Sequence, residues 1–260
     1  MERSSIDDTR PYPWRVFFVL LAGSVLSILA VLPYLTVVLR PILAVHPLRL
    51  PLPLLALIQG TTNCSVAIIL GLLVSRKIGL GAPVLEAWLY GRPSGAGRGL
   101  FWISCATGLG LGLVTVALIR SPLGAVLTAL PIASESAMPV WKRFLACFYG
   151  GVCEETLMRL FLLSLVMWLL GKFWKAPSGL PASGAFWTAN ILVAVAFGAG
   201  HLPLASQLTV LTPLLVTAII SLNGIVGLGF GYLYWKRGLE SAMLAHFSAD
   251  IVLHVLSPMF

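Results

Sequence analysis

The sequence predicts an all-α protein, a polytopic membrane bundle of about seven to eight transmembrane helices. Of its 260 residues, 58% are hydrophobic and only 10% are charged. Soluble chains carry about 25% charged residues and about 45–50% apolar residues, so a surface this poor in charge must face lipid. The length sets the number of spans, because each span needs about 20 residues plus a connection.

The charge pattern indicates membrane topology and not a nucleic-acid partner. The net charge of +8 is spread along the chain in ones and twos. A nucleic-acid-binding protein would gather it into a basic face. The four cysteines lie in apolar stretches, without the spacing of a zinc ribbon or a disulfide framework. We therefore expect them to be packing residues.

Seven apolar segments are the expected spans. The first follows a polar tail over residues 1–15 and is longer than the core of a cleavable signal peptide, so we expect a retained helix. The sixth is interrupted by Asn223-Gly224 and is either one bent helix or a helix followed by a short fragment. The segments cover residues 16–39, 52–75, 100–119, 144–171, 185–204, 208–235 and 239–256.

The distribution of Lys and Arg favours seven spans with a cytoplasmic N-terminus. This arrangement places a clear excess of basic residues inside, as the positive-inside rule expects, and dividing the sixth segment removes most of that excess. Residues 79–98 and 121–141 mix aromatic residues with Gly, Pro and Arg, so we expect them at the membrane interface. The pairs Gly108/Gly112 and Gly227/Gly231 predict close helix packing.

Charged and imidazole side chains are concentrated in three of the expected spans. A charge at the centre of a spanning helix costs about 2.5–3.5 kcal/mol on insertion scales, so each one needs a reason. They are Glu154, Glu155 and Arg159 in the fourth span, His201 in the fifth, and His246 and Asp250 in the last.

The spacing of these residues predicts how they face one another. Glu155 and Arg159 are four residues apart, so they share a helix face and can form an ion pair. Glu154 lies about 100° around the helix and can face another neighbour. His246 and Asp250 also share a face. Because Arg159 neutralises only one of two carboxylates, packing alone does not explain the set.

Such a convergent set can activate water as a general base while polarising a carbonyl, or bind a divalent metal. Other intramembrane protease chemistries lack their residues here. The zinc motif HExxH is absent, and Asp250 is the only aspartate outside the N-terminal tail, so a paired-aspartate site cannot form. No serine lies in a motif with an evident partner.

Three motifs follow one another on successive apolar helices. They read Glu154-Glu155-x-x-x-Arg159, Phe197-x-x-x-His201 and His246-x-x-x-Asp250. In this order they resemble the CPBP intramembrane proteases, a family that includes the type II CAAX prenyl endopeptidases and bacteriocin-processing or immunity (Abi-like) proteins. The resemblance covers roughly residues 140–256, and it implies CPBP-like catalytic helices over residues 140–260. The first 140 residues carry no part of it, and we expect residues 16–139 to add N-terminal spans and interfacial segments to the same single membrane domain.

The resemblance also implies a role for each motif residue. Glu154 would activate water with His201 as its partner, and Glu155 with Arg159 would form a supporting ion pair. His246 with residue 250 would stabilise the oxyanion or complete a metal site. The family's last motif more usually ends in Asn, and Asp250 makes a metal-ligand role more attractive. The ligands of a zinc or cobalt ion would be Glu154, His201, His246 and Asp250.

The expected function is hydrolysis of a peptide bond near the terminus of a membrane-associated peptide or protein, prenylated or not. Two alternatives remain open. Mid-membrane carboxylates and histidines also serve proton- or ion-coupled transporters, although no inverted repeat is evident. A non-catalytic immunity or scaffold protein is the other. We expect a bacterial cytoplasmic membrane, or the endoplasmic reticulum in a eukaryote.

Overall fold

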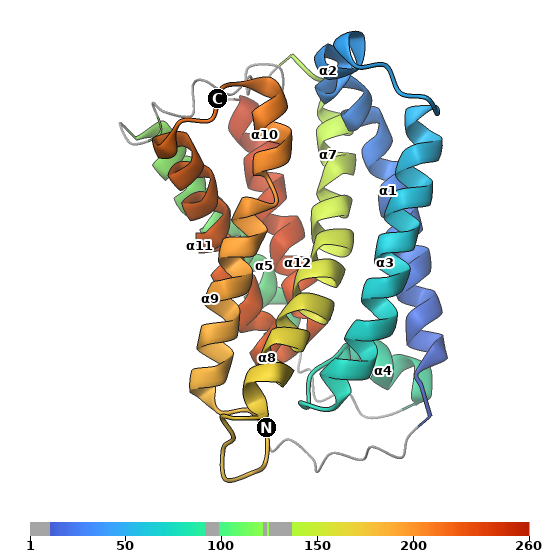
Figure 1. The fold of residues 1–260 in the computed structure, drawn as a ribbon, viewed down its shortest axis with the longest axis vertical. Coiled ribbons are helices and arrows are strands. Elements are labelled where there is room, and N and C mark those ends of the chain that lie inside the picture. Colours follow the sequence, from blue (N-terminus) through green and yellow to red (C-terminus); the bar gives the residue numbers. More distant parts are fainter. Residues whose placement is uncertain (1–10, 92–98, 122–123, 125–136, 260) are drawn as a thin grey trace.

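The protein is a bundle of long helices that run along its longest axis (Figure 1). The computed structural model describes residues 11–91, 99–121, 124 and 137–259. In these ranges every regular element is helical. The predicted all-α membrane bundle is therefore confirmed.

The N-terminal part supplies one side of the bundle. Helix α1 (Trp14–Val38) packs against α3 (Leu52–Arg76), and the short α2 (Arg40–Val45) connects them at one end. At the other end lies α4 (Pro83–Tyr90), within the segment expected at the interface. The next long helix is α5 (Gly99–Arg120). The second expected interfacial segment, 121–141, lies mostly outside the described residues.

Residues 140–171 form one continuous helical path through the bundle (Figure 1). Its hydrogen-bonding pattern alternates between α and π, because two π-helical stretches widen its middle. The path consists of α7 (Val140–Phe148), η2 (Tyr149–Glu154), η3 (Thr156–Leu163) and α8 (Ser164–Gly171).

The C-terminal part completes the bundle. Its elements are α9 (Ser183–Ala199), α10 (Leu202–Leu208), α11 (Pro213–Arg237), α12 (Leu239–Asp250), the π-helix η4 (Ile251–Leu256) and the short η5 (Ser257–Met259). The sixth expected span is one helix, α11, because the amide of Asn223 donates a hydrogen bond to the Ile219 carbonyl within it and does not break it. Helix α9 ends where Gly200 follows it, and Pro203 lies in the first turn of α10, where its missing N–H costs nothing.

Six helices in the described ranges are long and apolar enough to cross a membrane. The expected seven to eight is thus too high by this criterion. The difference is the expected span 144–171, which is helical but carries Glu154, Glu155 and Arg159 and is divided by π-helical turns. The charged residues and the π-helical turns lie at the same place, and together they explain why this segment is not among the six helices.

Close glycine contacts bring the helices of the last motif to the centre. A Cβ on Gly108 of α5 would collide with the Ala245 carbonyl of α12, and one on Gly112 would lie 2.9 Å from the Ala249 carbonyl. A Cβ on Gly227 of α11 would contact α9 at Ala194, 3.5 Å away. These contacts agree with the packing that the glycine pairs predict. The first two hold α12 against α5, and the third holds α11 against α9.

Candidate active site

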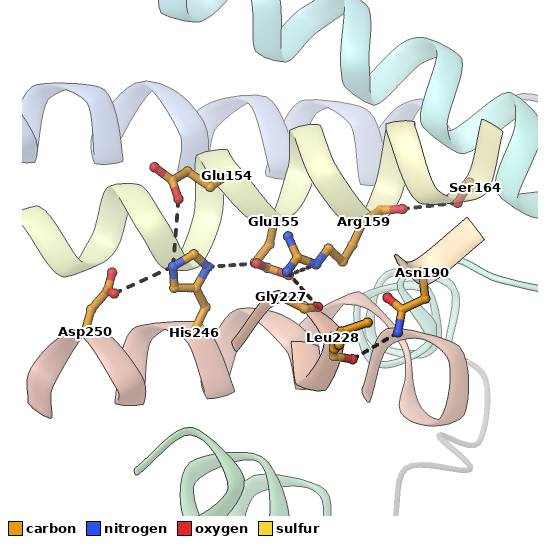
Figure 2. Close-up of polar contacts among 9 residues, drawn as sticks. All are labelled: Glu154, Glu155, Arg159, Ser164, Asn190, Gly227, Leu228, His246 and Asp250. Atoms are coloured by element: carbon orange, nitrogen blue, oxygen red, sulfur yellow. Dashed lines mark hydrogen bonds and ion pairs between the residues drawn. The ribbon is translucent and has the colours of Figure 1, made fainter. Parts of the chain in front are cut away.

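The polar residues of the first and last motifs form one chain of contacts between residues 140–171 and α12 (Figure 2). Arg159 Nε lies 3.3 Å from Glu155 Oε2, the ion pair that the spacing predicts. Glu155 Oε1 lies 2.7 Å from His246 Nδ1. On the other side of the ring, His246 Nε2 lies 3.6 Å from Asp250 Oδ1 and 3.8 Å from Glu154 Oε2. The imidazole therefore connects three carboxylates.

The two adjacent glutamates differ in exposure. The side chain of Glu155 is 0% exposed, whereas that of Glu154 is 27% exposed. Glu155 is held from both sides, by Arg159 and His246. Among the described residues, the ionic contact of Glu154 is with the far edge of the imidazole. Of the two carboxylates, Glu154 is the one that water or a substrate can reach.

Arg159 is buried, and its charge is balanced locally. Its Nη2 donates a hydrogen bond of 3.1 Å to the Gly227 carbonyl of α11. Its guanidinium carbon lies 5.0 Å from the ring centre of Phe197 and 5.5 Å from that of Phe230. A buried charge requires such partners, because an unpaired one is very costly in a low-dielectric interior.

His201 lies beside this chain of contacts and outside it. It is the N-cap residue of α10, and its Nδ1 donates a hydrogen bond of 2.9 Å to the Phe197 carbonyl, which fixes the proton on that nitrogen because a carbonyl only accepts. Its ring meets the Phe197 ring edge-on at 5.1 Å, and the same ring contacts His246 at 5.7 Å. Among the described residues, His201 makes no hydrogen bond or ion pair with Glu154.

Gly150 gives His246 and Asp250 the space that they occupy. A Cβ at this position would collide with Asp250 Oδ2 and lie 3.0 Å from His246 Nε2. Gly150 is not among the site residues expected from the sequence. Its signal is the Gly150-Gly151 pair, which comes directly before the first motif.

Wide helical turns surround the site residues. Glu154 ends the π-helix η2, Glu155 lies between η2 and η3, and Asp250 comes directly before η4. π-Helical turns occur mostly as local insertions in α-helices and frequently at functional sites. Here they change the angle at which successive side chains leave the helix.

Residues 136–252 match the family described as Type II CAAX prenyl endopeptidase Rce1-like. This segment, which is less than half of the chain, is similar to that family. The match includes all three motifs and confirms the resemblance on which the site was predicted. No curated protein and no solved structure matches the chain.

The segment that is similar to the Rce1-like family supports an intramembrane peptidase in general. Together with six helices that can cross a membrane, the match identifies an integral, multi-pass membrane protein. The residues that face one another in the site all come from that segment. The N-terminal helices support it from outside, where α1 contacts η2 and α3 contacts η3.

The four expected metal ligands do not form a metal site in this arrangement. Among the described residues, no group of three or more His, Cys, Asp or Glu side chains is positioned to hold a metal ion. The Nδ1 atoms of His201 and His246 are hydrogen-bonded, to Phe197 and Glu155, which leaves Nε2 of each ring as the nitrogen that could bind a metal. The zinc or cobalt ion stays a prediction, and no step below depends on it.

Proposed function

We propose that this protein is an intramembrane endopeptidase in which Glu154 activates water for attack on a peptide carbonyl. The observation that carries the proposal is the difference in exposure and contacts between the adjacent residues Glu154 and Glu155. Glu155 is fully buried and engaged on both oxygens, whereas Glu154 is partly exposed and faces His246 Nε2. A general base must be ionised, reachable and close to the group that receives the developing charge.

The reaction divides between Glu154 and His246. Glu154 takes a proton from water, and the resulting hydroxide forms a bond to the carbonyl carbon. A proton on His246 Nε2 points toward the same space and stabilises the negative charge on the carbonyl oxygen. When the C–N bond breaks, Glu154 returns its proton to the amine that leaves. The products are a carboxylic acid and an amine, so atoms and charge balance.

Glu155 and Arg159 act indirectly in this scheme. The hydrogen bond from His246 Nδ1 to Glu155 selects the orientation of the imidazole, and the ion pair to Arg159 holds the carboxylate in place. Asp250, 3.6 Å from Nε2, adds negative charge beside the imidazole. We propose for His201 a place at the rim of the site, since its contacts are with Phe197.

Cleavage of quenched fluorescent peptides by purified protein tests the proposal. The panel includes a farnesylated CaaX peptide and its unprenylated form, because the substrate class is open. Glu154→Gln is expected to reduce the cleavage rate by about 10²–10⁴-fold, the usual contribution of a general base. Adding a chelator, and then zinc, tests the predicted metal in the same assay.

Glu240→Gln is the matched control for Glu154→Gln. Glu240 is a partly buried glutamate of α12, and its Oε1 accepts a hydrogen bond from the Leu85 amide, which a glutamine oxygen can still accept. We expect this variant to cleave at the wild-type rate. Equal cleavage by wild type and Glu154→Gln would refute the assignment of the base.

A further inference from the structure

Phe230 of α11 lies flat against the imidazole of His246. The two ring centres are 4.6 Å apart and the planes differ by 21°, a stacked arrangement. Phe230 is 0% exposed, and its ring also faces the guanidinium of Arg159. Phe230 therefore touches two members of the chain Arg159–Glu155–His246, although it belongs to none of the three motifs.

A single hydrogen bond does not fix the plane of an imidazole. His246 is held at Nδ1 by Glu155, 2.7 Å away. The ring can still tilt about that contact, and a tilt swings Nε2 away from Glu154. Phe230 covers one face of the ring, and Phe197 meets it edge-on at 5.7 Å with the planes at 88°. A stacked contact and a perpendicular contact together restrict the tilt.

The same pair of phenylalanines supports Arg159. Within the described residues, Arg159 Nη1 has no hydrogen-bond partner. The guanidinium instead lies near the rings of Phe197 and Phe230, where the negative face of an aromatic ring attracts a cation. Both partners of Glu155 therefore contact Phe230.

We propose that Phe230 is a positioning residue, which keeps His246 Nε2 directed at the space between Glu154 and Asp250. Its effect on the reaction rests on the proposed function, since it acts through His246. Its effect on the orientation of the imidazole does not, and can be measured without a substrate.

Phe186 of α9 provides a control that tests whether Phe230 acts through packing alone. It too is 0% exposed and belongs to the same hydrophobic core as Phe230. It stacks on Trp235 at 4.0 Å and 15°, instead of on a site residue. Phe230→Leu and Phe186→Leu each remove one buried aromatic stack and leave an apolar side chain. A loss of packing affects both variants, and a loss of positioning affects only the first.

The test measures kcat, KM, the melting temperature and the histidine NMR signals of the full-length protein in detergent. The chain has four histidines, so single His→Gln variants assign each signal. In Phe230→Leu we expect the ring protons of His246 to lose the chemical-shift displacement that the stacked Phe230 ring causes. We also expect the signal of the hydrogen-bonded Nδ1 proton of His246 to weaken. We expect kcat to fall by about 10–10²-fold, as for a displacement of about 1 Å, while KM changes less than about twofold.

Each outcome decides the proposal. With Phe186→Leu we expect unchanged His246 signals and kcat within about threefold of wild type, even if its melting temperature falls as far as that of Phe230→Leu. Equal losses of kcat in both variants, or unchanged His246 signals in Phe230→Leu, would overturn the positioning role. If the wild type cleaves no peptide, the proposed function fails, while the His246 signals still decide whether Phe230 orients the ring.

Discussion

Glu154 and Glu155 show how two identical neighbouring side chains acquire different roles. Glu155 lies between Arg159 and His246 and is fully buried, so its charge is part of the packing. Glu154 is partly exposed and approaches His246 from the other side of the ring. A buried ion pair adds little net stability, but removing one partner leaves an uncompensated charge.

Glu155→Gln is therefore expected to destabilise the protein, whereas Glu154→Gln is not. Removing the Glu155 charge leaves Arg159 buried without its anionic partner, which costs about 3–5 kcal/mol for a buried pair. Thermal unfolding of both variants in the same detergent measures the difference. A Glu154→Gln variant that melts as early as Glu155→Gln would contradict the division into a reactive and a supporting carboxylate.

Sequence reasoning found the charged residues of the site but not the residues that hold them. The cost of charge in a membrane makes Arg159 and the glutamates conspicuous, and the four-residue spacing predicts their ion pair. Phe230 and Gly150 carry no such signal, because an apolar or small residue in a spanning helix resembles any packing residue. Only the approach of α11 and η2 to His246 distinguishes them.

At the scale of elements, the hydrophobic segments predict the helices because apolar length alone determines a span. The sequence left open whether residues 208–235 form one helix, and α11 is one helix. The π-helical turns at the site were not predicted. Hydrophobicity does not show whether a carbonyl accepts its hydrogen bond from the amide four or five residues ahead.

The contact between α5 and α12 gives a test of helix packing. Gly108→Ala would press its Cβ into the Ala245 carbonyl, directly before His246. We expect the variant to lose about 1–3 kcal/mol of stability, as overpacked cores do, and to lose cleavage as α12 shifts. Thermal unfolding and the peptide assay measure both effects.

Gly110→Ala is the matched control on the same helix. Its Cβ would meet no atom within 4 Å, because Gly110 faces away from the bundle. Alanine is the better helix former by roughly 0.5–1 kcal/mol, so this variant should be as stable as wild type or more so. If both alanine variants behave alike, close packing at Gly108 is not what holds α12.

At the scale of the whole molecule, the basic residues lie mostly at one end. Helices α3, α8 and α11 all end in the lower part of Figure 1. There they carry, at or just beyond their last residues, Arg76, Lys77, Lys172, Lys236 and Arg237. By the positive-inside rule, we expect this end to be cytoplasmic. It agrees with the cytoplasmic N-terminus expected from the sequence, since α1 begins at the same end.

The six apolar helices do not include residues 140–171. Whether this segment also crosses the membrane decides from which side the site is reached. With 32 residues it is about 48 Å long at about 1.5 Å per residue, more than a hydrocarbon core of about 30 Å requires. We therefore expect it to cross despite its charges, which face other helices and not lipid. Residues before and after it should lie on opposite sides of the membrane.

Ser121→Cys and Ser178→Cys place a label on each side of this segment. In a Cys105→Ser background, the remaining native cysteines, Cys64, Cys147 and Cys153, are buried and give little labelling. We expect a membrane-impermeant maleimide to modify Ser121→Cys in intact cells, and Ser178→Cys only after the membrane is permeabilised. Labelling of both from the same side would mean that residues 140–171 enter and leave by one face. The glutamates would then be reached through a re-entrant helix instead of a span.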